Sequence, residues 1–170
     1  MTTPEDTRVT LSALMRAVDA NLLGTVHGGN LMKAVDDAAG VVANRFAGGP
    51  AVTAAMDEMS FLVPVRIGDL IHCSAQLNWA GRSSMEVGVR VEVDRWDENT
   101  PRIHVASAYL VMVAVDESGN PREVPALDYV TESDQRRARE AQIRREHRLA
   151  RREAILASRH PHDDAGPVGE

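Results

Sequence analysis

The feature that most constrains the fold is one helical repeat, from Gly28 to about Phe46, followed by segments of a different period. Apolar residues recur in this repeat at spacings of four and three, as on one face of a helix: Leu31, Val35, Ala38 and Val42. The glycines and proline of "AGGP" end it. Because the repeat is rich in alanine and glycine, a strand or a second helix can approach it closely. The pattern predicts one small-residue helix packed against other elements.

Four segments after this helix have strand composition: residues 51–65, 70–80, 85–96 and 103–116. Between Met85 and Val93, apolar residues alternate with polar ones at a period of two. The stretch "VTLSALMRAV" before the helix fits a strand or a short helix, and we favour a strand. The order predicts an α+β layer arrangement with an antiparallel sheet. One helix cannot cover both faces of such a sheet, so we expect sheet edges to pair across a dimer.

The C-terminal region differs in composition from the rest of the chain. Half of the 18 arginines lie between Arg136 and Arg159, interspersed with acids and few apolar residues. We expect a solvated helix over residues 132–158, stabilised by ion pairs such as Glu140 with Arg144. The organisation we predict is a first domain over residues 1–128, an Arg-rich helix over 129–159, and a disordered tail over 160–170.

Bulk properties exclude several classes of protein. The net charge of −6 gives no general affinity for nucleic acid or for a membrane surface. Apolar runs are too short to cross a membrane, and the first residues do not resemble a secretory signal. Together with the single Cys73, these features predict a soluble cytoplasmic protein. No metal-ligand spacing, phosphate loop, dinucleotide fingerprint or serine elbow occurs, so we expect no metal.

Polar residues before and within the first helix are the candidates for chemistry. Asp36 borders the apolar stripe, where a half-buried carboxylate is costly unless it has partners or a task, whereas Asp37 faces less clearly toward the core. Asn21 is either a turn former or an amide that holds a carbonyl or a water. Gly28 and Gly29 lead into the helix, where unpaired N–H groups could polarise a carbonyl.

Taken together, four stretches resemble the hot-dog-fold acyl-CoA thioesterases, including the brain-type hydrolase and its short bacterial relatives. They are "DANLLGTVHGG", "LMKAVDDAAG", "VTAAMDEMSFLVPVRIGD" and "AGRSSMEVGVRVEV". The resemblance implies a long helix wrapped by a curled antiparallel sheet, and hydrolysis of fatty acyl-CoA to free acid and CoA. It also implies active sites between two hot-dog units, with an asparagine from one and an aspartate from the other. Asn21 and Asp36 stand at these positions, so a homodimer would hold two complete sites, and three dimers would form a hexamer.

The resemblance gives each candidate a role in thioester hydrolysis. Asp36 is expected to act as the general base on water or, as an alternative, as a nucleophile. The N–H groups of Gly28 and Gly29 would stabilise the oxyanion, and Asn21 would orient the water or the carbonyl. CoA belongs to substrate and product, so no separate cofactor is expected. The turn "GRSS" is a candidate for phosphate contact as well as an ordinary hairpin turn, through Arg82, Ser83 and Ser84.

Two alternatives belong to other classes of protein. A hot-dog domain could sense acyl-CoA and bind DNA through the Arg-rich helix, although its interspersed acids and the lack of a helix-turn-helix pattern oppose this. A hot-dog enoyl-CoA hydratase would use a histidine near the helix, and His27 is the only candidate. The "HGG" sequence also replaces the bulky aromatic of several bacterial relatives, which leaves the acyl-chain preference open.

Overall fold

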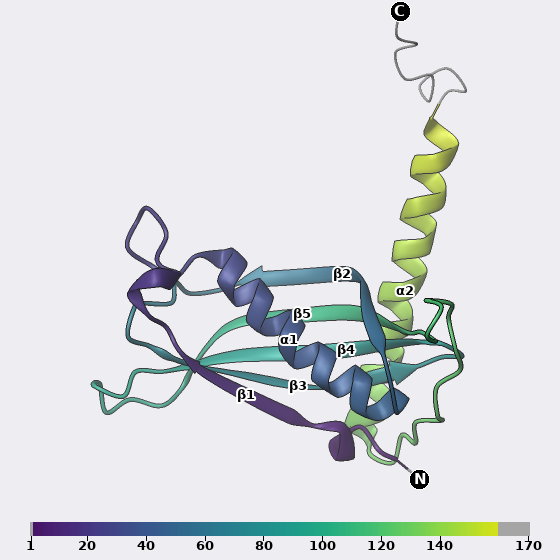
Figure 1. Cartoon of the computed structure of the whole chain (residues 1–170), viewed down its shortest axis with the longest axis horizontal. Helices are drawn as coiled ribbons and strands as arrows, with labels where there is room; N and C mark the ends of the chain where they lie inside the picture. The colour runs from purple at the N-terminus through teal and green to yellow at the C-terminus, as the bar shows by residue number, and fades with distance from the viewer. Residues whose placement is uncertain (1, 160–170) are drawn as a thin grey trace, which may run out of the picture.

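One five-stranded antiparallel sheet organises the chain, and the computed structural model describes residues 2–159 (Figure 1). The strands lie in the order β1-β3-β4-β5-β2. Their bounds are β1 Val9–Leu14, β2 Ala51–Phe61, β3 Leu70–Ala80, β4 Ser84–Asp94 and β5 Ile103–Ala114. The four strands predicted after the helix are confirmed. The predicted disordered tail, residues 160–170, lies outside the described residues.

The stretch before the first helix is a strand at its start. β1 pairs with β3, with Val9 opposite Ala75 and Leu14 opposite Leu70. The strand ends there, and the short 3-10 helix η2 (Ala17–Asp19) follows; another, η1 (Glu5–Thr7), precedes the strand. The N–H of Arg16 donates to the carboxylate of Asp19, which closes this turn and ends the extended conformation. The strand prediction is therefore confirmed for the first half of the segment.

The long helix α1 (Gly28–Ala47) lies across one face of the sheet, in front of β3, β4 and β5 in Figure 1. Its apolar stripe is fully buried: Val35, Ala38, Ala39 and Ala43 expose 0–1% of their surface. The opposing strands supply valine, leucine and methionine, so the core is almost free of aromatic rings. α1 ends where Gly48 adopts the left-handed conformation at φ 64°, which a glycine adopts without strain.

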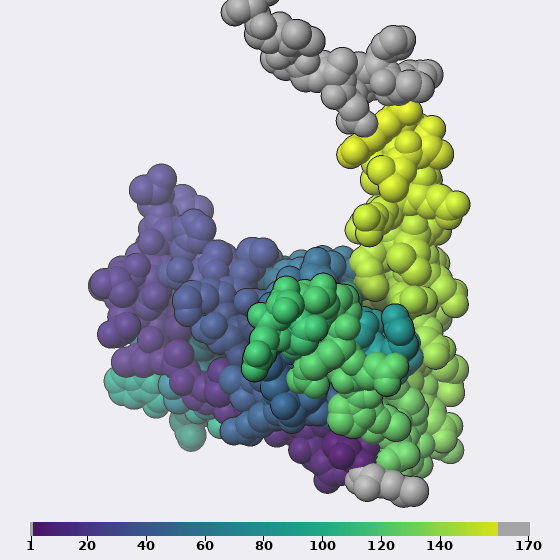
Figure 2. Space-filling model, turned by 45° about the vertical axis from the view of Figure 1, so that its right-hand side comes forward, coloured from purple at the N-terminus to yellow at the C-terminus, as the bar shows by residue number. Residues whose placement is uncertain are grey.

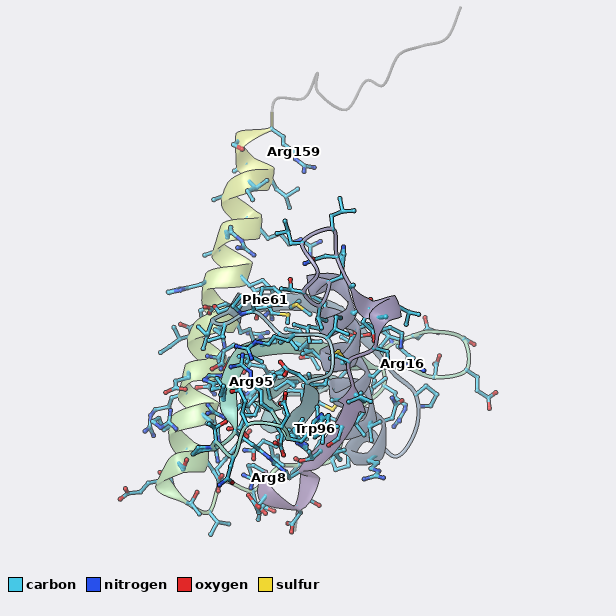
Figure 3. All side chains as sticks on the ribbon, turned by 90° about the vertical axis from the view of Figure 1, so that its left-hand side faces the viewer. Arg8, Arg16, Phe61, Arg95, Trp96 and Arg159 are labelled. Carbon is cyan, nitrogen blue, oxygen red and sulfur yellow. The ribbon has the colours of Figure 1, made fainter. Side chains whose placement is uncertain are left out.

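A second helix, α2 (Glu132–Ser158), covers the opposite face of the sheet, so the molecule has three layers (Figure 3). Thr131 and Asp134 form a reciprocal capping box at its start. Ala138 and Ala141 are buried against the sheet. The expectation of a wholly solvated helix is therefore wrong for the first half of α2.

The ion pairs of α2 also differ from the expected ones. Glu140 pairs with Arg136, whereas Arg144 reaches the sheet and binds Glu86 through two hydrogen bonds of 2.6 and 3.0 Å. Glu86 accepts a further hydrogen bond from Asn78 on β3 at 3.0 Å. Sequence spacing suggested pairs within the helix, but a buried carboxylate on β4 is the stronger partner for the guanidinium.

Two further properties of the described residues bear on function. Within residues 2–159, no helix is long and apolar enough to span a bilayer. In the same range no group of three or more His, Cys, Asp and Glu side chains is placed to hold a metal ion. Cys73 is buried in the core, and this burial raises the pKa of its thiol to about 11.

Candidate active site

The loop before α1 fixes Asn21 by local hydrogen bonds. Its Oδ1 accepts from the N–H groups of Leu23 and Thr25, at 2.8 and 3.2 Å, and its Nδ2 donates to the Thr25 hydroxyl at 2.9 Å. The turn-forming role of Asn21 is therefore confirmed, while a role in catalysis stays a prediction. Leu22 and Leu23 at the tip of the loop are 106% and 89% exposed. Such exposed apolar side chains are typical of a surface that another molecule covers.

One of the two glycine N–H groups at the start of α1 already donates a hydrogen bond within the same chain. His27 is the N-cap residue, and its Nδ1 accepts from the N–H of Gly29 at 2.9 Å. This geometry requires an unprotonated Nδ1, with any ring proton on Nε2. The N–H of Gly28 has no hydrogen-bond partner within residues 2–159. Of the two predicted oxyanion donors, the structure leaves Gly28 available, whereas the Gly29 donor is occupied.

Asp36 lies near the middle of α1 and faces the edge strand β2. The hydroxyl of Thr53 on β2 donates to Asp36 Oδ1 at 2.6 Å. Both residues line an open cleft of about 670 Å³, together with Val52, Asn44 and Met112 among others. Asp36 is exposed in the single chain, so the expectation of a half-buried carboxylate is wrong for one protomer. Its position beside an unpaired strand edge is the reason.

Asp37 is bound differently from Asp36. Its carboxylate pairs with Lys33 Nζ at 2.8 Å, one helical turn away, with both side chains exposed. The hydrogen bond to Asp37 is the main cause of the raised pKa of Lys33. Asp37 is exposed and lines the same cleft, but of the two carboxylates it is Asp36 that accepts a hydrogen bond from another element of the fold.

Asn21 and Asp36 lie in different parts of the fold, Asn21 in the loop before α1 and Asp36 near the middle of α1. Asp36 lies eight residues after Gly28, which at 1.5 Å per residue is about 12 Å along the helix axis. Asn21 belongs to the loop of residues 20–27, and this loop lies beyond the N-terminal end of α1 (Figure 1). Its side-chain hydrogen bonds all stay within that loop.

Thr53 is a candidate site residue that the sequence did not reveal. It stands near the start of β2, where a register shift separates it from Ala55 in the pairing with β5. A threonine in a strand is so common that its residue type gave no signal. The available signal was positional, since Thr53 lies at the start of one of the four stretches that carry the family resemblance.

A second, smaller cleft lies at the N-terminal end of α1. It has a volume of about 280 Å³, and apart from Gly28 its lining is apolar: Val26, Leu31, Phe61, Leu62, Val63, Pro64 and Val65. Phe61 and Leu62 are 50% and 56% exposed. The free N–H of Gly28 therefore borders an apolar cleft, a combination suited to a polar carbonyl at the end of an apolar chain.

The turn "GRSS" is an ordinary hairpin turn in its backbone. The N–H of Gly81 donates to the Ser84 carbonyl at 2.8 Å, and the carbonyls of Arg82 and Ser83 accept from Val124 and Ala114. The turn follows the last residue of β3, whereas Val26 near Gly28 bonds to Val65, just before β3. The length of β3, about 35 Å, separates the two regions. One protomer does not bring this turn to Gly28.

The sequence of the chain is similar to those of several known proteins. Residues 23–95 match the sequence profile of the thioesterase superfamily. The protein VdlD of Helicobacter pylori is 35% identical over 147 residues, which is 86% of this chain and 83% of VdlD. The Bacillus subtilis protein YkhA, named an uncharacterized acyl-CoA thioester hydrolase, is 33% identical over 79% of this chain and 80% of its own.

Two solved structures superpose on most of the chain with TM-scores of 0.83. One is an apo-hexameric acyl-CoA thioesterase, 34% identical, covering 88% of this chain and 95% of its own. The other is an acyl-CoA hydrolase of Staphylococcus aureus in complex with butyryl-CoA, CoA and CoA disulfide, 31% identical, covering 92% and 95%. Variants of this hydrolase with an aspartate, an asparagine or a threonine replaced by alanine are also solved. The chain described here belongs to the thioesterase superfamily and has its hot-dog fold.

Proposed function

We infer that this protein is an acyl-CoA thioesterase that hydrolyses fatty acyl-CoA to free acid and CoA. The observation that carries this inference is Asp36 on an open cleft, held by the Thr53 hydroxyl. In the S. aureus hydrolase, the replaced aspartate follows the replaced asparagine by 15 residues, and the replaced threonine follows the aspartate by 17. The same two spacings separate Asn21, Asp36 and Thr53. These spacings support a common site.

In the proposed mechanism, Asp36 acts as a general base on water. The hydrogen bond from Thr53 occupies Oδ1 and fixes the carboxylate, so that Oδ2 is free to accept a proton from the attacking water. The water oxygen bonds to the thioester carbon, and the negative charge moves to the carbonyl oxygen. The N–H of Gly28 stabilises this oxyanion at the positive end of α1. Collapse of the intermediate breaks the C–S bond and releases CoA thiolate, which takes up the proton held by Asp36.

The proposed site requires two copies of the chain. A single substrate carbonyl needs Asn21, the Gly28 N–H and Asp36 within reach directly or through one water. The separation of about 12 Å along α1 prevents this within one chain. Among residues 2–159, β2 pairs with β5 alone and leaves an open edge that carries the exposed Val52 and Phe61. Pairing of two β2 edges would continue the sheet and place two α1 helices side by side.

The same reasoning extends to the nucleotide end of CoA and to the assembly. Contacts of Arg82, Ser83 and Ser84 with CoA phosphates stay part of the proposal, and their distance from Gly28 requires that another copy supplies them. A trimer of dimers is the proposed assembly, in line with the hexameric relative. The hydratase alternative is disfavoured, because His27 Nδ1 is occupied by its own helix.

The activity is tested by thiol release from a panel of acyl-CoAs from acetyl to palmitoyl. CoA release above the uncatalysed rate for at least one chain length is the expected result. Its absence across the whole panel would contradict the function. An enoyl-CoA substrate belongs in the panel, because hydration without thiol release would favour the hydratase.

Shared sites are tested by mixing inactive Asn21→Ala and Asp36→Ala proteins after reversible dissociation. Each hybrid dimer then holds one intact site and one site that lacks both residues. Random mixing makes half of the dimers hybrid with half of their sites intact, so activity returns to roughly a quarter of wild type. Hybrids confirmed by mass that show no activity would contradict shared sites without contradicting the thioesterase function.

A further inference from the structure

The end of α2 extends past the edge of the sheet, and its path can be followed strand by strand (Figure 1). α2 contacts β3, Ala138 and Ala141 in its first half are buried, and Arg137 lines a cavity together with Ser74 of β3. Arg144 binds Glu86 on β4 and lies 3.7 Å from the ring centre of Tyr109 on β5. One turn later, Arg148 binds Asp57 on β2. The helix thus crosses the strands in their sheet order and reaches the last strand at Arg148.

The residues after this crossing have no sheet beneath them. Every residue from 149 to 159 is exposed, and Figure 2 shows this end of α2 clear of the rest of the molecule. Arg159 stands at the far end, away from the strands (Figure 3). Ten helical residues span about 15 Å, the width of about three strands. We call residues 149–158 the arm.

The arm carries the same face that docks the first half of α2. Ala141, Arg148 and Ile155 follow one another at seven-residue spacing, which returns to the same side of the helix after two turns. Ala141 is buried and Arg148 binds the sheet, so Ile155 points toward the plane in which the sheet would continue. Ile155 is 48% exposed in the single chain, and the adjacent Leu156 is 53% exposed.

Charge on the arm and on the body is complementary. Residues 149–158 hold two arginines and one glutamate, a net charge of +1, within a chain of net charge −6. The remainder therefore carries −7. The exposed Glu58 of β2 lines the same small cleft as Arg148 and Arg151, where the arm leaves the sheet. A second copy joined along β2 would present its own Glu58 on the far side of the junction.

We propose that the arm packs on the outer sheet face of a second copy of the chain, across the junction of the two β2 edges. This rests on the edge pairing described under the proposed function. By two-fold symmetry each protomer gives one arm and receives one, which encloses the sheet junction from the side opposite to the two α1 helices. The length of the arm, about 15 Å, matches the combined width of the partner's β2, β5 and β4.

The test compares two charge insertions on α2. Ile155→Glu places a carboxylate on the docking face of the arm. Ile143→Glu is the matched control, since Ile143 is 52% exposed and lies about 200° around the helix from the buried Ala141. The readouts are dimer dissociation by sedimentation equilibrium and amide hydrogen exchange of residues 149–158 in the full chain. We expect Ile155→Glu to weaken the dimer by about tenfold or more and Ile143→Glu to change it less than twofold.

Hydrogen exchange distinguishes the outcomes when the dimer is so tight that its dissociation cannot be measured. Arm amides protected in the wild-type dimer and exposed in Ile155→Glu support the proposal. Arm amides that exchange as freely as an isolated helix in an active wild-type dimer would overturn it and leave the thioesterase function intact. Loss of hexamers with unchanged dimers would also overturn it, because the arm would then join dimers to one another. A monomer at all concentrations would overturn both the arm contact and the shared site.

Discussion

α1 is held on one face of the sheet by valine, leucine and alanine side chains, whereas α2 is held on the other by arginine bound to carboxylates on the strands. The α1 side is apolar, and its buried residues expose almost no surface. On the α2 side Glu86 is 4% exposed and binds both Arg144 and Asn78. Transfer of such charges out of water is costly unless every partner is in place. The comparison teaches that the α1 side depends on close apolar packing, while the α2 side depends on complete pairs.

The largest effect we expect is the loss of activity in Asp36→Asn on the α1 side. Removal of a general base typically costs about 10²–10⁴ in rate, and the amide leaves the Thr53 hydroxyl bonded and the core unchanged. Measurement of kcat/KM together with the urea midpoint separates activity from stability. Asp37→Asn, one residue away and paired only with Lys33, is the control. A larger loss in that control would reverse the assignment of the two carboxylates.

The free energy of unfolding is expected to fall by about 3 kcal/mol when one partner of the pair between Arg144 on α2 and Glu86 on β4 is removed. Arg144→Ala leaves Glu86 buried without its cation, and we expect the lower end of the range for broken buried pairs because Arg144 is 18% exposed. Urea unfolding at one fixed protein concentration measures it. The double variant Glu86→Met with Arg144→Met is expected to unfold close to wild type. An equal loss in the double variant would show that packing, and not the unpaired charge, holds α2.

Overpacking of the α1 side is expected to cost about 1–3 kcal/mol. Ala39→Leu adds three carbons where the exposed fraction is 0%, so strands or α1 must shift. The same urea experiment measures this change, with Ala150→Leu on the exposed arm as the matched control. A neutral Ala39→Leu would contradict close packing between α1 and the sheet.

The smallest effect belongs to the solvent side of α1. Lys33→Met removes an exposed pair between residues four apart, and because such pairs contribute little in water we expect only a small fall in the urea midpoint. The loss should shrink further in high salt, because exposed charges are screened. Calorimetric or urea midpoints at low and high salt check this. A salt-independent loss would point to packing of the Lys33 stem.

The sequence predicted the α1 side better than the α2 side for a physical reason. Apolar periodicity reports burial directly, so the extent of α1 and the alternation in β4 were predicted closely. The docking of α2 depends on Glu86 and Asp57, which lie 58 and 91 residues from their arginine partners. Such pairs leave no local pattern in the sequence.

The candidate site shows the same contrast between local patterns, which the sequence reveals, and contacts that only the folded chain forms. Asp36 is a candidate because it borders the apolar stripe, the family resemblance gives Asn21 and Asp36 their roles, and the structure places Asp36 on a cleft. The hydrogen bond from Thr53 and the capture of the Gly29 N–H by His27 needed the folded backbone. A glycine pair in a sequence does not reveal which N–H remains free.

The strand order has a consequence for how the chain is made. β1 and β2 occupy the two edges of the sheet, yet they are synthesised first, and their partners β3 and β5 come later. Val9 cannot pair until its partner Ala75 has been synthesised, and Ala51 cannot pair until Ala114 has been synthesised. Only β3, β4 and β5 follow one another as neighbours. The apolar face of α1 is therefore not fully covered until about residue 114 has emerged, and an incompletely covered face exposes the nascent chain to aggregation.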